Sequence, residues 1–187
     1  MKTFLRFAIV AFALAAAGCS DVVIQDAPGV TSRTSYYPGE IEYATRKGAI
    51  ATTVLGNPFG GPKEEFDTRV LGLMKHQNRG VPAEFVATQG DRTDQVFNVV
   101  VAFNLPANIP ARRLCKDPAA LSTTPHAGNL RMTAAFCHVG SLQSGTFGIA
   151  NNLSGPDDPK FAELVRGVTH AMTPAETDPD ERGRVMF

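Results

Sequence analysis

The chain has 187 residues, with 18 basic and 18 acidic side chains, no tryptophan and 8% aromatic residues. This balance gives no net positive field, so it argues against nucleic-acid binding and against electrostatic attachment to anionic lipids. The low aromatic content argues against a platform on which sugars or bases stack. The length is sufficient for one domain with a substantial core.

The first twenty residues have the layout of a secretory signal. Lys2 and Arg6 are basic, no acidic residue precedes Asp21, and residues 7–17 form an uninterrupted apolar run. A helix needs about 20 apolar residues to cross the core of a bilayer, so this run is short for a transmembrane span. We therefore expect residues 1–18 to be a signal peptide rather than a buried helix. The mature chain would carry 16 basic and 18 acidic residues.

Two cleavage sites compete at the end of this run. Ala15, Ala16 and Ala17 satisfy the small-residue rule of the ordinary signal peptidase, which would leave Gly18 as the first mature residue. The stretch from Ala16 to Cys19 instead resembles the lipobox of bacterial lipoproteins, although leucine is commonest where Ala16 stands. The resemblance implies cleavage between Gly18 and Cys19, and attachment of diacylglycerol to the Cys19 thiol with acyl chains such as palmitate.

The lipoprotein resemblance also implies a location and a class of partner. Each buried methylene contributes about 0.8 kcal/mol, so several acyl chains hold a protein in a membrane firmly. In some bacteria an Asp directly after the cysteine favours the inner membrane; Ser20 stands there, so the resemblance favours the outer membrane. The domain would lie in the periplasm. Its partners would be the membrane and other envelope proteins, with no role for nucleic acid.

The first elements of the mature chain follow from local patterns. Residues 19–35 are expected to be the lipidated N-terminus and a tether, which could include a short strand at 22–24. Loose alternation at 41–46 and the β-branched run at 49–55 favour a hairpin across Gly48.

A helix is predicted over residues 63–80, directly after the turn cluster at 57–62. Its apolar stripe consists of Phe66, Val70, Leu73 and Met74. Gly80 is the expected stop.

Four more strands and a final helix are expected. The strands lie at 83–88, 96–105, 130–139 and 146–150, with a short helical turn near 111–115. Asp158 would cap the final helix, and Pro159 would take its first position. The predicted fold is α+β, a mostly antiparallel sheet of about five strands with two helices packed on one face. It would form a single domain over 36–174, followed by a flexible tail at 175–187.

Three cysteines are present. If Cys19 carries lipid, Cys115 and Cys137 remain as a pair that an oxidising compartment would join. Closing such a loop stabilises a fold by about 3 kcal/mol in the chain-entropy model. The alternative is a reactive Cys137 thiol beside His138, but neighbours on a strand point to opposite faces. We favour the disulfide.

No stretch of the chain specifies a reaction. The four histidines, at positions 76, 126, 138 and 170, have no metal-ligand spacing, so neither a metal nor a cofactor is expected. No base or oxyanion site accompanies Ser141 or Ser144. The sequence therefore favours a non-catalytic accessory, assembly or interaction module of the cell envelope.

The alternative is a periplasmic hydrolase or small-ligand-binding protein whose site is assembled only in three dimensions. A deep polar pocket at His126, His138 or Ser144 would favour the enzyme. An exposed apolar groove or an unpaired sheet edge would favour the module.

Overall fold

The computed structural model describes most of the chain after the predicted signal peptide. The described residues are 21–27, 36–46, 48–88, 96–125 and 128–174. The predicted signal peptide, Cys19, much of the predicted tether, His126 and the predicted tail lie outside the described residues. Within them, no helix has the length and apolar character needed to cross a membrane.

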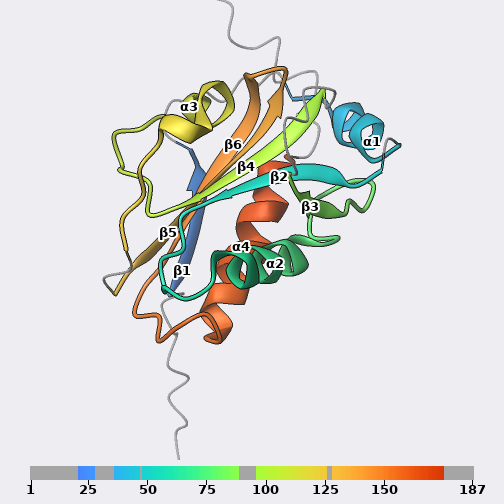
Figure 1. Cartoon of the computed structure of the whole chain (residues 1–187). Coiled ribbons are helices and arrows are strands. Elements are labelled where there is room, and N and C mark those ends of the chain that lie inside the picture. Colours follow the sequence, from blue (N-terminus) through green and yellow to red (C-terminus); the bar gives the residue numbers. More distant parts are fainter. Residues whose placement is uncertain (1–20, 28–35, 47, 89–95, 126–127, 175–187) are drawn as a thin grey trace, which may run out of the picture.

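One sheet of six strands forms the centre of the domain (Figure 1). The strands are β1 (Val22–Asp26), β2 (Ile50–Leu55), β3 (Phe85–Ala87), β4 (Phe97–Phe103), β5 (Leu130–His138) and β6 (Ser141–Ala150). Their order across the sheet is β1-β6-β5-β4-β2-β3. The three pairs from β1 to β4 are antiparallel, whereas β4–β2 and β2–β3 are parallel. The predicted α+β fold with a mostly antiparallel sheet is confirmed.

In the part of the chain that the structure describes, four α-helices pack on this sheet. They are α1 (Pro38–Arg46), α2 (Lys63–Met74), α3 (Arg112–Lys116) and α4 (Pro159–Met172). Buried side chains of α1, α2 and α4 join one core on the same face, and α3 covers the opposite face. The predicted pair of helices on one face corresponds to α2 and α4.

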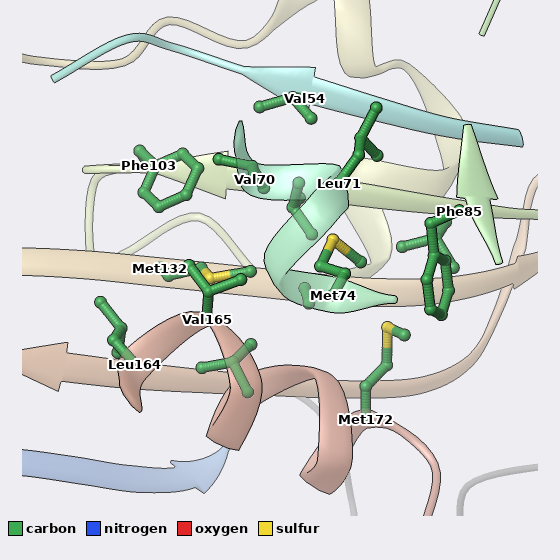
Figure 2. Packing of buried hydrophobic residues seen from close by; sticks show 14 of the residues in the cluster. Val54, Val70, Leu71, Met74, Phe85, Phe103, Met132, Leu164, Val165 and Met172 are labelled. Carbon is green, nitrogen blue, oxygen red and sulfur yellow. The ribbon is translucent and has the colours of Figure 1, made fainter. Parts of the chain in front are cut away.

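The face under α2 and α4 carries the larger core (Figure 2). A smaller core lies on the opposite face, under α3. Strand β4 contributes side chains to both cores, because side chains alternate along a strand: Val99 and Val101 point into the large core and Val100 into the small one. At the centre of the large core, the Phe66 ring lies 5.0 Å from Phe103 and 5.9 Å from Phe161.

The expected tether contributes a strand to the sheet. Strand β1 pairs with β6 along its whole length, from Val22 opposite Ala150 to Asp26 opposite Thr146. The backbone pairing extends to Asp21, whose carbonyl accepts a hydrogen bond from the Asn151 amide at 2.9 Å. The predicted short strand at 22–24 is therefore present as β1. It is longer than predicted, and it brings the number of strands in the sheet from the predicted five to six.

The predicted hairpin at 41–55 is wrong in its first half, which forms α1. Tyr37 occupies the N-cap, Pro38 the first helical position, and the Glu40 carboxylate accepts a hydrogen bond from the Tyr37 amide at 3.3 Å. Ile41 and Ala44, three residues apart, are buried together. The N-terminal cap and the helical spacing of the buried residues therefore make this segment a helix, although its apolar residues also alternate loosely.

The helix predicted over 63–80 ends six residues early, at Met74. His76 has a positive φ of 60°, which takes the chain out of the helix. The buried Asn78 side chain then holds the loop, since its oxygen accepts from the Ala83 amide at 2.8 Å and its nitrogen donates to the Val81 carbonyl at 2.7 Å. A local side-chain network therefore competes successfully with the last helical turn.

Candidate functional site

A solvent-open hollow lies at the end of the sheet where β4 begins and β5 ends. Its volume is about 510 Å³. The lining residues are Tyr37, Gly39, Glu40, Tyr43, Val96, Phe97 and His138. They come from the first turns of α1, the start of β4 and the last residue of β5. We call this feature the aromatic hollow.

A row of rings forms the floor of the aromatic hollow. Phe97 stacks on the buried Phe136 with a centroid distance of 5.4 Å, and His138 stacks on Phe97 at 4.6 Å. Tyr43 meets the edge of Phe97 at 6.0 Å, and Tyr36 meets Phe136 at 5.8 Å. Because Phe136 belongs to the large core, the floor is continuous with the rigid interior of the domain.

Glu40 is the acidic side chain of the aromatic hollow. Burial raises its pKa, and this effect is opposed by the hydrogen bond from the Tyr37 amide and by the nearby His138. Burial, followed by the charge of Glu40, raises the pKa of Tyr36 to about 12. The hollow therefore contains a carboxylate that is less well hydrated than one on an open surface.

The chemical groups of the aromatic hollow suit contact with a ligand. They are aromatic faces, an imidazole and one carboxylate held on a helix N-terminus. Of the three residues named for the hydrolase alternative, His138 lines the hollow, whereas Ser144 is buried elsewhere and its hydroxyl donates to the Met172 carbonyl at 2.5 Å. Within the described residues, no group of three or more His, Cys, Asp or Glu side chains could hold a metal ion.

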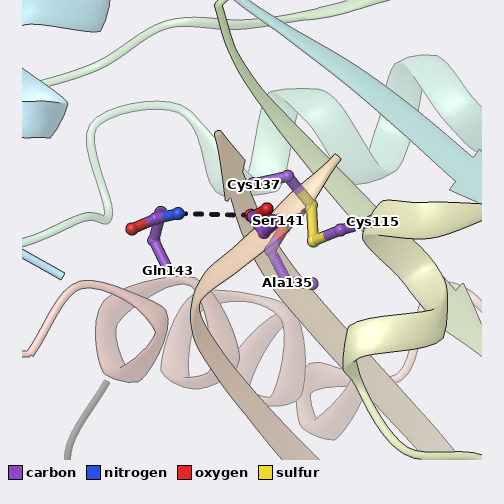
Figure 3. Close-up of a disulfide and its surroundings, with 5 residues drawn as sticks. All are labelled: Cys115, Ala135, Cys137, Ser141 and Gln143. Atoms are coloured by element: carbon purple, nitrogen blue, oxygen red, sulfur yellow. Dashed lines mark hydrogen bonds between the residues drawn. A yellow bond between two sulfur atoms is a disulfide. The ribbon is translucent and has the colours of Figure 1, made fainter. Parts of the chain in front are cut away.

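The two cysteines that the sequence singles out lie on the opposite face of the sheet. Cys115 of α3 and Cys137 of β5 form a disulfide with their Cα atoms 5.5 Å apart (Figure 3). Cys137 points into the small core under α3, whereas its neighbour His138 lines the aromatic hollow. The two side chains therefore do not meet, as the alternation along a strand predicts.

The remaining histidines within the described residues lie near helix ends. His170 is in the last turn of α4, where its Nε2 accepts a hydrogen bond from Arg79 at 2.9 Å. His76 follows α2 and lies 3.7 Å from Glu84. Neither reaches the lining of the aromatic hollow.

Sequence reasoning missed Tyr37, Glu40, Tyr43 and Phe97. A usable signal was present, because all three tyrosines of the chain fall within residues 36–43. The overall aromatic content of 8% concealed this local concentration. Proline followed two residues later by glutamate is also the pattern of a helix start, which places these side chains at one helix N-terminus.

Comparison with known proteins assigns no family. No protein-family model matches the chain, and no curated protein matches it. Among solved structures, the chain is similar to the PelC dodecamer from Paraburkholderia phytofirmans, with 10% identity, a TM-score of 0.42, and coverage of 83% of this chain and 98% of that chain. A leucine-to-methionine variant of that dodecamer gives the same TM-score and identity over 82% of this chain and 98% of that one. Likeness at this level establishes neither a shared family nor a shared function.

Proposed function

We propose that the protein is a lipid-anchored lipoprotein of the bacterial cell envelope, and that its domain is a non-catalytic interaction module on the periplasmic side. One observation carries the proposal. The sheet begins at Val22, three residues after Cys19, and the aromatic hollow lies at the opposite end of that sheet. An anchor on Cys19 would therefore orient the domain as well as attach it.

The anchored end follows from the contacts of Asp21. Its carbonyl is bonded to the Asn151 amide, and its carboxylate lies 3.4 Å from the Lys160 ammonium. Lys160 also donates to the carbonyls of Asn151 and Asn152 at 3.0 Å. The three residues from Cys19 to Val22 span at most about 11 Å. A lipidated Cys19 would hold this end of the sheet against the membrane.

The aromatic hollow would then face away from the membrane. Strand β5 begins at Leu130, opposite Ala150 and so close to the start of β1, and it ends at His138 in the hollow. Its nine residues span about 26 Å at the usual rise of a strand. Figure 1 shows α1, which carries much of the lining, near the end of the sheet at which β4 starts. With Cys19 anchored in this way, the hollow would be presented to the periplasm.

Exposed, largely apolar side chains line the aromatic hollow, and one more, Val139, lies next to it. Their exposed fractions are 55% for Tyr37, 46% for Tyr43, 40% for Val96 and 73% for Val139. Single exposed apolar residues are ordinary, but a group of them around one hollow is typical of interaction surfaces, where tyrosine is enriched. The pattern supports a binding role for this end of the domain.

The first test is the mass of the N-terminal peptide of the protein purified from its native membrane. The proposal predicts acylated Cys19, and a Cys19→Ser variant that is released from the membrane fraction. A mature chain that begins with unmodified Gly18 and fractionates without membrane would overturn the anchor.

The second test addresses orientation. In membrane vesicles, a bulky maleimide should label a Tyr43→Cys variant several-fold faster than an Asn152→Cys variant, because Asn152 lies at the anchored end. The matched control places each substitution in the Cys19→Ser background, where the two rates should become similar. Equal rates in the anchored protein would contradict a fixed orientation.

A further inference from the structure

We propose that the aromatic hollow binds an arginine side chain presented by a protein partner. The inference rests on the proposed function, since it names the chemistry by which the interaction module recognises its partner. It depends on the side chains that line the hollow and on their position relative to the anchor.

The first argument is the affinity of aromatic faces for cations. The lining contains two exposed tyrosines and the half-buried Phe97, and none of its described residues is a lysine or an arginine. A cation within about 6 Å of such a ring is attracted by the negative electrostatic potential over its face. Among the described lining residues, the Tyr43 ring therefore offers an electron-rich surface, and His138 is the only basic side chain.

The second argument is the position of Glu40. Its carboxylate is fixed at the first turn of α1 by the Tyr37 amide, at 3.3 Å, and lies beside the rings. A partly dehydrated carboxylate attracts a cation more strongly than one in open solvent does. Charge complementarity therefore favours a cationic occupant over a neutral or anionic one.

Arginine suits this combination better than lysine. Its guanidinium is planar, so it can stack on an aromatic face while its N–H groups donate to a carboxylate. Such charge-assisted hydrogen bonds are shorter and stronger than those between neutral groups. The ring of Tyr43 and the carboxylate of Glu40, which are three residues apart on α1, provide these two kinds of contact in one hollow.

The shape and position of the hollow favour a protein as the source of the cation. The hollow is open and would take the end of one side chain, while Val96 and Val139 beside it offer apolar contact to the rest of a partner. In the proposed orientation the hollow lies about 26 Å along β5 from the anchored end, beyond the lipid head groups of the anchoring membrane. Arginine and tyrosine are also among the residue types enriched at the energetic hot spots of protein interfaces.

The chain offers a selective probe for this binding. It contains three tyrosines and no tryptophan, and all three tyrosines lie at or beside the hollow. The mature protein, labelled with carbon-13 only in its tyrosine rings and held in detergent micelles, would report on this site alone. The titrants are the peptide acetyl-Leu-Arg-Leu-amide, its citrulline and lysine counterparts, and phosphocholine.

The arginine peptide should shift the Tyr37 and Tyr43 ring signals and bind about tenfold more tightly than the citrulline peptide, which has the same shape without the charge. The Glu40→Gln variant should weaken arginine binding about fivefold to tenfold, since glutamine preserves the helix cap but removes the charge. Glu42→Gln is the matched control, because Glu42 is on the same helix but pairs with Arg46. It should leave the affinity unchanged.

Equal affinity for arginine and citrulline peptides, or equal loss in the Glu40 and Glu42 variants, would overturn the proposal. Tighter binding of phosphocholine than of the arginine peptide would also overturn it, in favour of a lipid head group. The Cys19 mass and the labelling rates are independent of these titrations. A failure of the arginine site is thus distinguishable from a failure of the anchored module.

Discussion

The two faces of the sheet are stabilised in different ways. Under α1, α2 and α4, the described residues bury one continuous apolar cluster that includes three phenylalanines in mutual contact. Under α3, the described residues that are fully part of the corresponding cluster number seven, and two of them are the disulfide-bonded cysteines. Apolar burial thus stabilises the first face, and a covalent bond supplements a small core on the second.

The lengths of the helices explain this difference. Helix α4 has 14 residues and buries six side chains along one stripe, whereas α3 has five residues and buries two. A helix of five residues cannot form a stable amphipathic face by itself. The Cys115–Cys137 bond ties α3 to β5 where packing alone offers little.

The largest expected effect is the loss of a buried leucine from the large core, compared with the loss of a matched leucine from the small one. Leu164 in α4 and Leu114 in α3 are both fully buried. Leu164→Ala should cost about 4 kcal/mol of unfolding free energy, because the rigid large core cannot collapse onto the cavity. Leu114→Ala should cost about 2 kcal/mol, since the short α3 can move inward. Denaturant unfolding followed by circular dichroism measures both, and equal losses would contradict the comparison.

The second prediction concerns the covalent bond. The double variant Cys115→Ala/Cys137→Ala removes a cross-link between residues 22 positions apart. It should lower the unfolding free energy by roughly 3 kcal/mol, because the unfolded chain regains the freedom of that loop. The wild type unfolded under reducing conditions is the control and should match the variant. A loss below about 1 kcal/mol would mean that the small core suffices without the bond.

Close packing of α4 on the sheet gives the third prediction. A Cβ atom at Gly148 in β6 would lie 2.6 Å from Leu164, 2.7 Å from Ile24 and 2.8 Å from Val168. Gly148→Ala should therefore cost about 1–3 kcal/mol through overpacking of the large core. Gly72→Ala in α2, where a Cβ meets nothing within 4 Å, is the control and should stabilise the helix by up to about 1 kcal/mol. Equal behaviour of the two variants would contradict tight packing at Gly148.

The sequence predicted those parts of the fold that have strong local patterns. The apolar run of β4, the stripe and cap of α4 and the cysteine pair were all recognisable, because each is specified by residues close together or by chemistry. Helix α1 was mistaken for a strand, since Ile41 and Tyr43 alternate while Ile41 and Ala44 have helical spacing, and short segments satisfy both periods. Strand β1 was undervalued because its partner, β6, lies more than a hundred residues away.

The candidate site was harder to predict than the fold. The aromatic hollow joins α1 to residues near positions 97 and 138, which meet only because Phe97 pairs with His138 across β4 and β5. His138 was noticed for its sequence neighbour Cys137, yet the two side chains lie on opposite faces. Such a site depends on strand register, which no local pattern reports.

The smallest expected effect lies at the solvent-exposed start of α4. The Asp158 carboxylate accepts hydrogen bonds from the amides of Lys160 at 2.9 Å and Ser154 at 3.0 Å. The Ser154 bond, followed by the Lys160 bond, lowers the pKa of Asp158. Because the folded state favours the ionised form, this group stabilises the fold above its unfolded pKa of about 3.9. That contribution is lost as the pH falls through the lower folded value.

Asp158→Asn separates the cap from the charge, since asparagine also caps helices but does not titrate. The wild type should be slightly more stable than this variant at pH 7, and the difference should vanish at a pH below the folded pKa. Denaturant unfolding of both proteins across this range measures the effect. If the stability difference between the two proteins stayed constant with pH, it would arise from the geometry of the cap rather than from its charge. Either way, a cap at the surface should matter less than Leu164 or the disulfide, because it buries no apolar area.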